Sequence, residues 1–176
     1  MRRILIIGPG GAGKSTLARR LGARLGLEVL HLDKFYWRPG WVEPARDEWL
    51  KTVAELTARD SWIMDGNYSG SLDLRLARSD TVVFLDLPRR VCLWRIARRR
   101  ISYRAAARPD MAAGCHEVLT LKFARWVWDY PRRSRPKVLA RLAAAGDGRR
   151  IIRLRSRREV EQFLAAPNKW TEQSAD

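Results

Sequence analysis

The stretch that decides the fold is Gly8-Pro9-Gly10-Gly11-Ala12-Gly13-Lys14-Ser15, followed by Thr16, which fits the phosphate-binding pattern G-x-x-x-x-G-K-[ST]. An apolar, β-rich run precedes it at residues 3–7, and leucines repeat every four residues over 17–25. A strand, a glycine loop and a helix in this order surround a phosphate with backbone N–H groups and the positive end of the helix. We therefore expect this loop to bind the phosphates of ATP.

Each residue type in the loop has a chemical reason. The glycines let the backbone approach the phosphates without a clash from a Cβ atom. Lys14 is expected to reach the β- and γ-phosphates, and the Ser15 hydroxyl is expected to ligate Mg²⁺. The expected cofactors are therefore ATP and Mg²⁺.

The length and composition indicate a single domain over residues 1–176. The sequence has no apolar run long enough to span a membrane, and the apolar stretch near the start is too short for an export signal. Cys92 and Cys115 are the two cysteines, and they lack C-x-x-C spacing. This pattern is typical of a reduced, cytoplasmic protein.

The net charge of +16, from 35 basic and 19 acidic residues, leaves two interpretations open. The excess could serve a polyanionic partner such as nucleotide phosphates or nucleic acid. It could equally reflect arginine used on solvated faces, because net charge governs non-specific binding and not the fold.

Strands and helices alternate along the chain. The sequence predicts strands near residues 3–7, 27–32, 61–64, 81–85 and 150–154, and predicts helices near 15–25, 72–78, 115–130, 137–145 and 158–164, with others beginning at Pro44 and Pro88. Residues 81–85 are apolar without a break, as in a strand covered on both faces. The predicted fold is α/β: a three-layer P-loop NTPase with a five-stranded parallel sheet and helices on both faces.

Three aspartates follow predicted strands, at the edge where parallel sheets bind ligands: Asp33, Asp65 and Asp86. Asp65 could hold Mg²⁺ through water or cap a turn, and the metal role is favoured. Asp33 could orient or deprotonate a hydroxyl of the phosphate acceptor, or cap a helix. Asp86 precedes a helix start, where capping is at least as good an explanation.

The chain resembles the adenylate-kinase-like P-loop kinases in the Asp65-Gly66 dipeptide, in Leu85-Asp86-Leu87-Pro88, and in an R-x-x-x-R formed by Arg95 and Arg99. The resemblance implies that Arg95 and Arg99 contact phosphates and that a helical lid closes over the nucleotide. It places a lid-like insertion at about 101–136. Further phosphate-binding arginines in that lid would be Arg132, Arg133 and Arg135, which could alternatively contact nucleic acid.

A narrower resemblance is to the bacterial topology modulation proteins. It rests on these stretches together: His31-Leu32-Asp33, the segments 37–41 and 62–68, Arg108-Pro109-Asp110-Met111, Gly114-Cys115 and Trp126-Val127-Trp128. The name of that group implies an influence on DNA topology but no chemical mechanism.

The sequence departs from adenylate kinases where the acceptor nucleotide would bind. Asn67-Tyr68-Ser69 replaces the family's Phe-Pro-Arg, and Asp33 stands where a Thr-Gly pair is usual. A carboxylate repels a nucleotide phosphate, whereas small-molecule kinases such as shikimate kinase use an Asp at a similar place for the acceptor hydroxyl. Trp37 and Trp41 could stack a base or sugar there, or only fill the seam beneath their loop.

The leading hypothesis is an ATP-dependent kinase that transfers the γ-phosphate to a nucleoside monophosphate or a small hydroxyl compound. The alternatives are an ATP-regulated nucleic-acid-binding protein that influences DNA topology, and an ATPase switch without an acceptor. No helix-turn-helix, ribonucleoprotein or zinc-finger pattern supports the nucleic-acid hypothesis.

Overall fold

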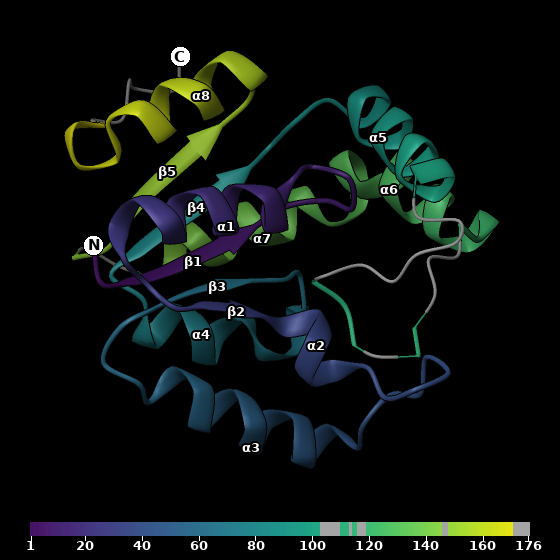
Figure 1. Ribbon diagram of the computed structural model, residues 1–176, viewed down its shortest axis with the longest axis horizontal. Coiled ribbons are helices and arrows are strands. Elements are labelled where there is room, and N and C mark those ends of the chain that lie inside the picture. Colours follow the sequence, from purple (N-terminus) through teal and green to yellow (C-terminus); the bar gives the residue numbers. More distant parts are fainter. Residues whose placement is uncertain (103–109, 113, 116–118, 146–147, 171–176) are drawn as a thin grey trace.

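A parallel sheet of five strands forms the centre of the protein in the computed structural model, which describes residues 1–102, 110–112, 114–115, 119–145 and 148–170. The strands follow the order β2-β3-β1-β4-β5 (Figure 1). Their bounds are β1 (Arg3–Ile7), β2 (Val29–His31), β3 (Trp62–Asp65), β4 (Thr81–Leu85) and β5 (Arg150–Leu154). All four pairings are parallel, which confirms the predicted sheet.

Helices cover both faces of the sheet, as predicted. Side chains alternate along β1: Ile4 and Ile6 enter one apolar core, and Leu5 and Ile7 enter the other. The first core is completed by α1 (Lys14–Leu25), α5 (Arg89–Ser102), α6 (Leu121–Arg133) and α8 (Arg157–Ala165), and the second by α3 (Arg46–Thr57), α4 (Leu72–Arg78) and α7 (Arg135–Ala144). Figure 1 shows α1 and α8 on one side of the sheet and α3 and α4 on the other.

Short elements lie at the carboxyl edge of the sheet and position the site. The predicted strand 27–32 ends at His31, because Leu32 begins the helix α2 (Leu32–Tyr36). A 3₁₀ turn, η1 (Ser69–Ser71), leads from β3 into α4, and a second one, η2 (Pro167–Lys169), follows α8. Asp33 is therefore in the first turn of a helix, and Asp65 is the last residue of its strand.

The prediction for the segment after Cys115 was wrong in its boundaries. The helix α6 begins at Leu121, where the Thr120 side chain caps it by accepting a hydrogen bond from the Phe123 N–H, and it continues through Pro131 to Arg133. The chain then turns at Ser134, and α7 begins two residues before the predicted Lys137, with Pro136 in its first turn. That position needs no N–H donor, so proline starts this helix instead of breaking it.

Some predicted features lie outside the described residues. They are residues 103–109 of the predicted insertion, which include Arg108-Pro109, and Gly146, which directly follows the predicted helix 137–145.

Candidate functional site

The phosphate-binding loop joins β1 to α1 in a conformation that requires glycine. Gly8 has a φ of 146° and Gly11 a φ of 77°. A Cβ atom would lie 2.5 Å from the Leu85 carbonyl oxygen at Gly8, and 2.3 Å from the Cys92 carbonyl oxygen at Gly11. The backbone is thus pressed against β4 and α5, and its N–H groups and the start of α1 remain available to an anion.

Lys14, the first residue of α1, is folded back across the loop. Its Nζ donates hydrogen bonds to the carbonyl oxygens of Gly8 at 3.0 Å and Pro9 at 2.9 Å. Burial lowers the pKa of Lys14, while the negative charges of Asp33 and Asp65 oppose this shift. These two carboxylates therefore act on the Lys14 ammonium through space, which places them at the same site.

Ser15, Asp65 and His31 form a connected chain of polar side chains. The Ser15 Oγ donates to Asp65 Oδ2 at 2.7 Å, and His31 Nδ1 lies 2.5 Å from Asp65 Oδ1. His31 and Asp65 face each other in the register of β2 and β3, which explains why the buried histidine and carboxylate meet. Both oxygens of the Asp65 carboxylate are thereby fixed beside the loop.

The Ser15 hydroxyl and the Asp65 carboxylate fit the chemistry of Mg²⁺, which prefers oxygen ligands and takes few of them from protein when phosphates supply others. Within the residues that the structure describes, no group of three or more His, Cys, Asp or Glu side chains could hold a metal ion by itself. Ser15 and Asp65 are therefore the residues that could hold such an ion.

Asp33 is held by a side chain that sequence reasoning did not assign to the site. The Tyr68 hydroxyl donates to Asp33 Oδ1 at 2.6 Å. Burial, followed by the charge of Asp33 and this hydrogen bond, raises the pKa of Tyr68 well above its ordinary value. Tyr68 therefore remains a neutral hydrogen-bond donor and fixes the orientation of the Asp33 carboxylate.

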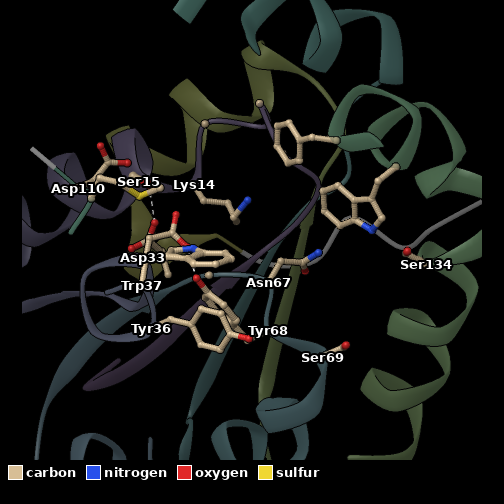
Figure 2. A pocket seen from close by; sticks show the side chains of 18 of the residues that line it. Lys14, Ser15, Asp33, Tyr36, Trp37, Asn67, Tyr68, Ser69, Asp110 and Ser134 are labelled. Atoms are coloured by element: carbon tan, nitrogen blue, oxygen red, sulfur yellow. Dashed lines mark hydrogen bonds between the residues drawn. The ribbon is translucent and has the colours of Figure 1, made fainter. Parts of the chain in front are cut away.

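Five aromatic rings border the same cavity as Asp33 and form what we call the aromatic wall: Tyr36, Trp37, Trp41, Trp49 and Tyr68. Neighbouring rings in the wall have centroids 4.4–5.1 Å apart. Trp49 is buried, and the other four rings are half-buried. The wall extends from α2 to α3 and the loop after β3, and Figure 2 shows Tyr36, Trp37 and Tyr68 close to Asp33.

The loop after β3 depends on Arg75, a residue that sequence reasoning missed. Arg75 lies in α4, has no exposed surface, and donates to the carbonyl oxygens of Gly66 at 3.1 Å, Tyr68 at 2.5 Å and Ser71 at 3.3 Å. Burial lowers its pKa to about 10, so the guanidinium is cationic at neutral pH. The sequence could have indicated that Arg75 is buried, because it lies between Leu72 and Leu76 on the apolar face of α4.

The arginines predicted to contact phosphate do not all lie at the same site. Arg95 donates through Nη1 to the Ala12 carbonyl oxygen at 3.0 Å, and the charge of Arg99 contributes to the lowered pKa of Lys14. Both lie beside the phosphate-binding loop, on consecutive turns of α5. They border the central cavity, as does Arg98, which was not predicted.

The cluster Arg132, Arg133 and Arg135 is divided by the turn at Ser134. Arg133 borders the cavity and lies near Asp129, whereas Arg132 is exposed and does not border it. Arg135 points elsewhere: its Nε donates to Asp86 Oδ2 at 2.9 Å, and that oxygen also accepts from the Arg153 Nε at 2.8 Å. The structure therefore gives Arg135 a structural ion pair at the end of β4.

Lys14, Ser15, Asp33, Asp65, the five rings of the aromatic wall, and Arg95, Arg98, Arg99 and Arg133 border one cavity of about 1790 Å³, whereas the buried Arg75 does not. Lys14 and Asn67 lie near its middle, Asp33, Tyr36, Trp37 and Tyr68 on one side, and Ser134 on the other (Figure 2). From α6, Phe123 and Trp126 also border it, with ring planes stacked at 5.8 Å. Phe123 lies over Gly10, where a Cβ would meet its ring at 2.5 Å.

Two further findings concern the protein as a whole. Among the helices of the described ranges, none is long and apolar enough to cross a membrane. Cys92 and Cys115 are both buried free thiols.

Comparison with solved structures shows which fold this is. The chain superposes on shikimate kinase from Acinetobacter baumannii, in complex with shikimate, with a TM-score of 0.61, 19% sequence identity, and coverage of 97% of this chain and 96% of that one. An unliganded sugar kinase from Janibacter gives a TM-score of 0.54 at 20% identity, covering 97% and 94% of the two chains. These similarities confirm the predicted P-loop NTPase fold.

Comparison with known sequences shows which proteins are related to this chain. No family model matches the chain. Shikimate kinase 1 from Yersinia enterocolitica is 33% identical over 101 residues, which cover 48% of this chain and 58% of that protein. The Bacillus subtilis protein YqaC, which is uncharacterised, is 30% identical over 129 residues, covering 71% of this chain and 70% of YqaC. The narrower grouping with the topology modulation proteins receives no support from these relatives; the chain belongs to the same family as YqaC.

Proposed function

We propose that this protein is a P-loop phosphotransferase that binds ATP with Mg²⁺ and passes the γ-phosphate to a small acceptor, either a nucleoside monophosphate or a small hydroxyl compound. One observation carries the proposal. The Ser15–Asp65 pair and Lys14, which suit a nucleotide triphosphate and its metal, share a single cavity with Asp33, a carboxylate held in place by Tyr68.

ATP, the phosphate donor, would be bound by the phosphate-binding loop and by arginines of α5. Phosphoryl transfer needs position and positive charge more than covalent chemistry from the protein. Lys14 would leave its loop carbonyls for the β- and γ-phosphates, and Ser15 and Asp65 would hold Mg²⁺, which neutralises charge on the phosphates when bound. Arg95 and Arg99 stand beside the loop and would stabilise the charge that develops on the transferred group.

Asp33 would bind and activate the phosphate acceptor. Its carboxylate could accept a proton from an acceptor hydroxyl, provided that the hydroxyl comes within hydrogen-bond reach. The Tyr68 hydrogen bond fixes one carboxylate oxygen, so the group is oriented before any acceptor binds. The similarity in fold and in part of the sequence to shikimate kinase supports a hydroxyl acceptor over a phosphate acceptor.

We further propose that residues 1–176 form one kinase domain in which the segment from about 101 to 136 acts as a lid. The described part of this segment supports the idea, because α6 packs beside α5 and places Phe123 against Gly10 of the loop. A cover at that position would exclude water from the transferred phosphate and suppress hydrolysis. Arg133 would enter the site from this element.

Only the net positive charge still supports the nucleic-acid hypothesis. The arginine cluster on which it relied is divided, because Arg133 borders the cavity, Arg132 faces solvent and Arg135 pairs with Asp86. Its test remains binding to duplex DNA across a salt series, which should weaken steeply as salt rises. We expect the kinase to work in the cytoplasm, as free thiols suggest.

The experiment that tests the proposed function is calorimetric titration with Mg²⁺·ATP. We expect wild-type protein to bind, and Lys14→Ala to bind at least tenfold more weakly, since a charged hydrogen bond contributes about 1.5–3 kcal/mol. Lys51→Ala is the matched control, because Lys51 is an exposed lysine of α3 that does not border the cavity. Wild-type affinity in Lys14→Ala would contradict the site assignment.

A further inference from the structure

We propose that the acceptor is a neutral compound of the nucleoside class, in which an aromatic ring carries a hydroxyl-bearing group, and that its ring lies on the aromatic wall while its hydroxyl lies at Asp33. This inference rests on the proposed function and names the substrate class of the same site. It is carried by the geometry of the wall, by the backbone of Trp41, and by the charges around Asp33.

The wall and Asp33 form one surface. Asp33, Tyr36 and Trp37 follow one another within and just after α2, and Tyr68 bonds to Asp33 while its ring lies 4.4 Å from that of Tyr36. A hydroxyl placed at the carboxylate therefore puts the rest of its molecule among aromatic rings. A ligand with a flat aromatic ring would bind most favourably to such a surface, because stacked and edge-on ring contacts add to the free energy of burying apolar area.

Trp41 lies in a backbone conformation that tryptophan seldom adopts. Its φ of 65° is the single positive value among non-glycine residues of the described chain, and it follows Gly40, whose φ is 79°. Glycine or asparagine would fit such a position with less strain. The indole is half-buried, borders the cavity and contacts the Trp37 ring at 5.0 Å. Strain retained beside a cavity is characteristic of residues that serve a ligand.

Two carboxylates accept hydrogen bonds from the hydroxyls of the wall. Tyr36 donates to Glu43 at 3.0 Å, and Tyr68 donates to Asp33 at 2.6 Å. An acceptor phosphate or carboxylate placed directly at Asp33 would be repelled by it. The N–H and O–H donors of a neutral nucleoside would be attracted. Arg95 and Arg99 of α5 lie instead beside the phosphate-binding loop, where the γ-phosphate would be.

The transfer step balances with these groups. The acceptor oxygen forms a bond to the γ-phosphorus, and the bond between that phosphorus and the β–γ bridging oxygen breaks. ADP leaves with the electron pair of the broken bond. The proton of the acceptor hydroxyl passes to the Asp33 carboxylate, so the products are ADP and a phosphorylated nucleoside.

The test measures phosphate transfer from γ-labelled ATP to the common ribo- and deoxyribonucleosides, with AMP and shikimate as acceptors that carry an anionic group. We expect transfer to at least one nucleoside and little or none to AMP or shikimate. In Trp41→Gly, we expect the KM for that nucleoside to rise about 5- to 150-fold, the range seen when a base-stacking ring is removed. Its melting temperature should change little, because relief of the strained φ offsets part of the lost contact with Trp37 and of the flexibility that glycine adds to the unfolded chain.

Phe35→Ala is the matched control, since Phe35 is an exposed ring of the neighbouring helix α2 and does not border the cavity. Trp37→Leu is the second variant, should Trp41→Gly fail to fold. Transfer to AMP or shikimate in place of nucleosides, or an unchanged KM in the tryptophan variants, would overturn this inference and leave the proposed function standing. Failure of the wild-type protein to bind Mg²⁺·ATP would instead remove the proposed function itself.

Discussion

Replacing Arg75 tests whether a buried cation organises the acceptor side of the cavity. Arg75→Met keeps an unbranched, helix-compatible side chain of similar length but removes all three hydrogen bonds to the loop after β3. The bonds to the carbonyl oxygens of Gly66 and Ser71 are fully buried, whereas the bond to Tyr68 is partly buried. The Gly66 carbonyl would lose its partner with no water to replace it, whereas the Ser71 carbonyl, at the N-cap of α4, keeps the first hydrogen bond of that helix.

The magnitude follows from the buried Gly66 carbonyl. A buried acceptor left without a partner costs about 1–3 kcal/mol. The lost bonds to Tyr68 and Ser71 add to this cost, and the removal of a buried cation offsets part of it, so we expect a net loss of about 1–3 kcal/mol in the free energy of unfolding. For a protein of this size, about 2–4 °C per kcal/mol predicts a fall in melting temperature of about 2–12 °C.

Urea denaturation and thermal melting measure this loss, and Arg78→Met provides the control. Arg78 lies in the same helix but is exposed, so its replacement should change stability by at most about 0.5 kcal/mol. Hydrogen exchange should also show faster exchange of amides in residues 66–71 of Arg75→Met. Equal stability of the two variants would refute the view that Arg75 holds this loop.

Two further predictions concern stability elsewhere. Gly11→Ala should destabilise the protein by more than about 2 kcal/mol in urea titrations, because its Cβ would meet the Cys92 carbonyl oxygen at 2.3 Å; Gly26→Ala, at a φ of 66° with nothing within 4 Å of its Cβ, should cost only about 1 kcal/mol. Similar losses in both would contradict this. Asp80 accepts backbone hydrogen bonds from Arg2 and Arg3, both at 2.8 Å. Partial burial opposes its ionisation, but the hydrogen bonds from Arg3, Thr81 and Arg2 outweigh burial and lower the pKa of Asp80 below 3.8. The ionised form is thus favoured in the folded state, so the stability advantage over Asp80→Ala, about 1–2 kcal/mol at pH 7, should shrink as the pH falls below about 4; an advantage that grows in acid would show the sign to be wrong.

The local features of the fold were predictable because local chemistry determines them. Residues 3–7, 81–85 and 150–154 are strands with the expected bounds, since β-rich apolar runs have few alternatives within a covered sheet. The glycine loop likewise follows from its own residues. The predicted helix 115–130 stops too early because Pro131 follows, and a proline within a helical pattern usually ends the helix, whereas here α6 continues past it to Arg133.

The contacts between distant residues were not predictable in the same way. His31 reaches Asp65 through the register of two strands, and Arg75 reaches the Gly66 carbonyl through the packing of α4. Arg135 looked equivalent to Arg133, yet the turn at Ser134 directs it to Asp86. Such side chains resemble any other histidine or arginine in sequence, and only the tertiary arrangement distinguishes their roles.

The most direct test of the central claim is transfer of label from γ-labelled ATP in a mixture of small metabolites, compared between wild type and Asp33→Asn. A carboxylate that accepts the acceptor proton contributes about 10²- to 10⁴-fold to the rate. We predict a labelled small-molecule product with wild-type protein, and a loss of that size in Asp33→Asn, which should still bind Mg²⁺·ATP. Label that appears only as inorganic phosphate, or a product formed equally fast by Asp33→Asn, would contradict the account.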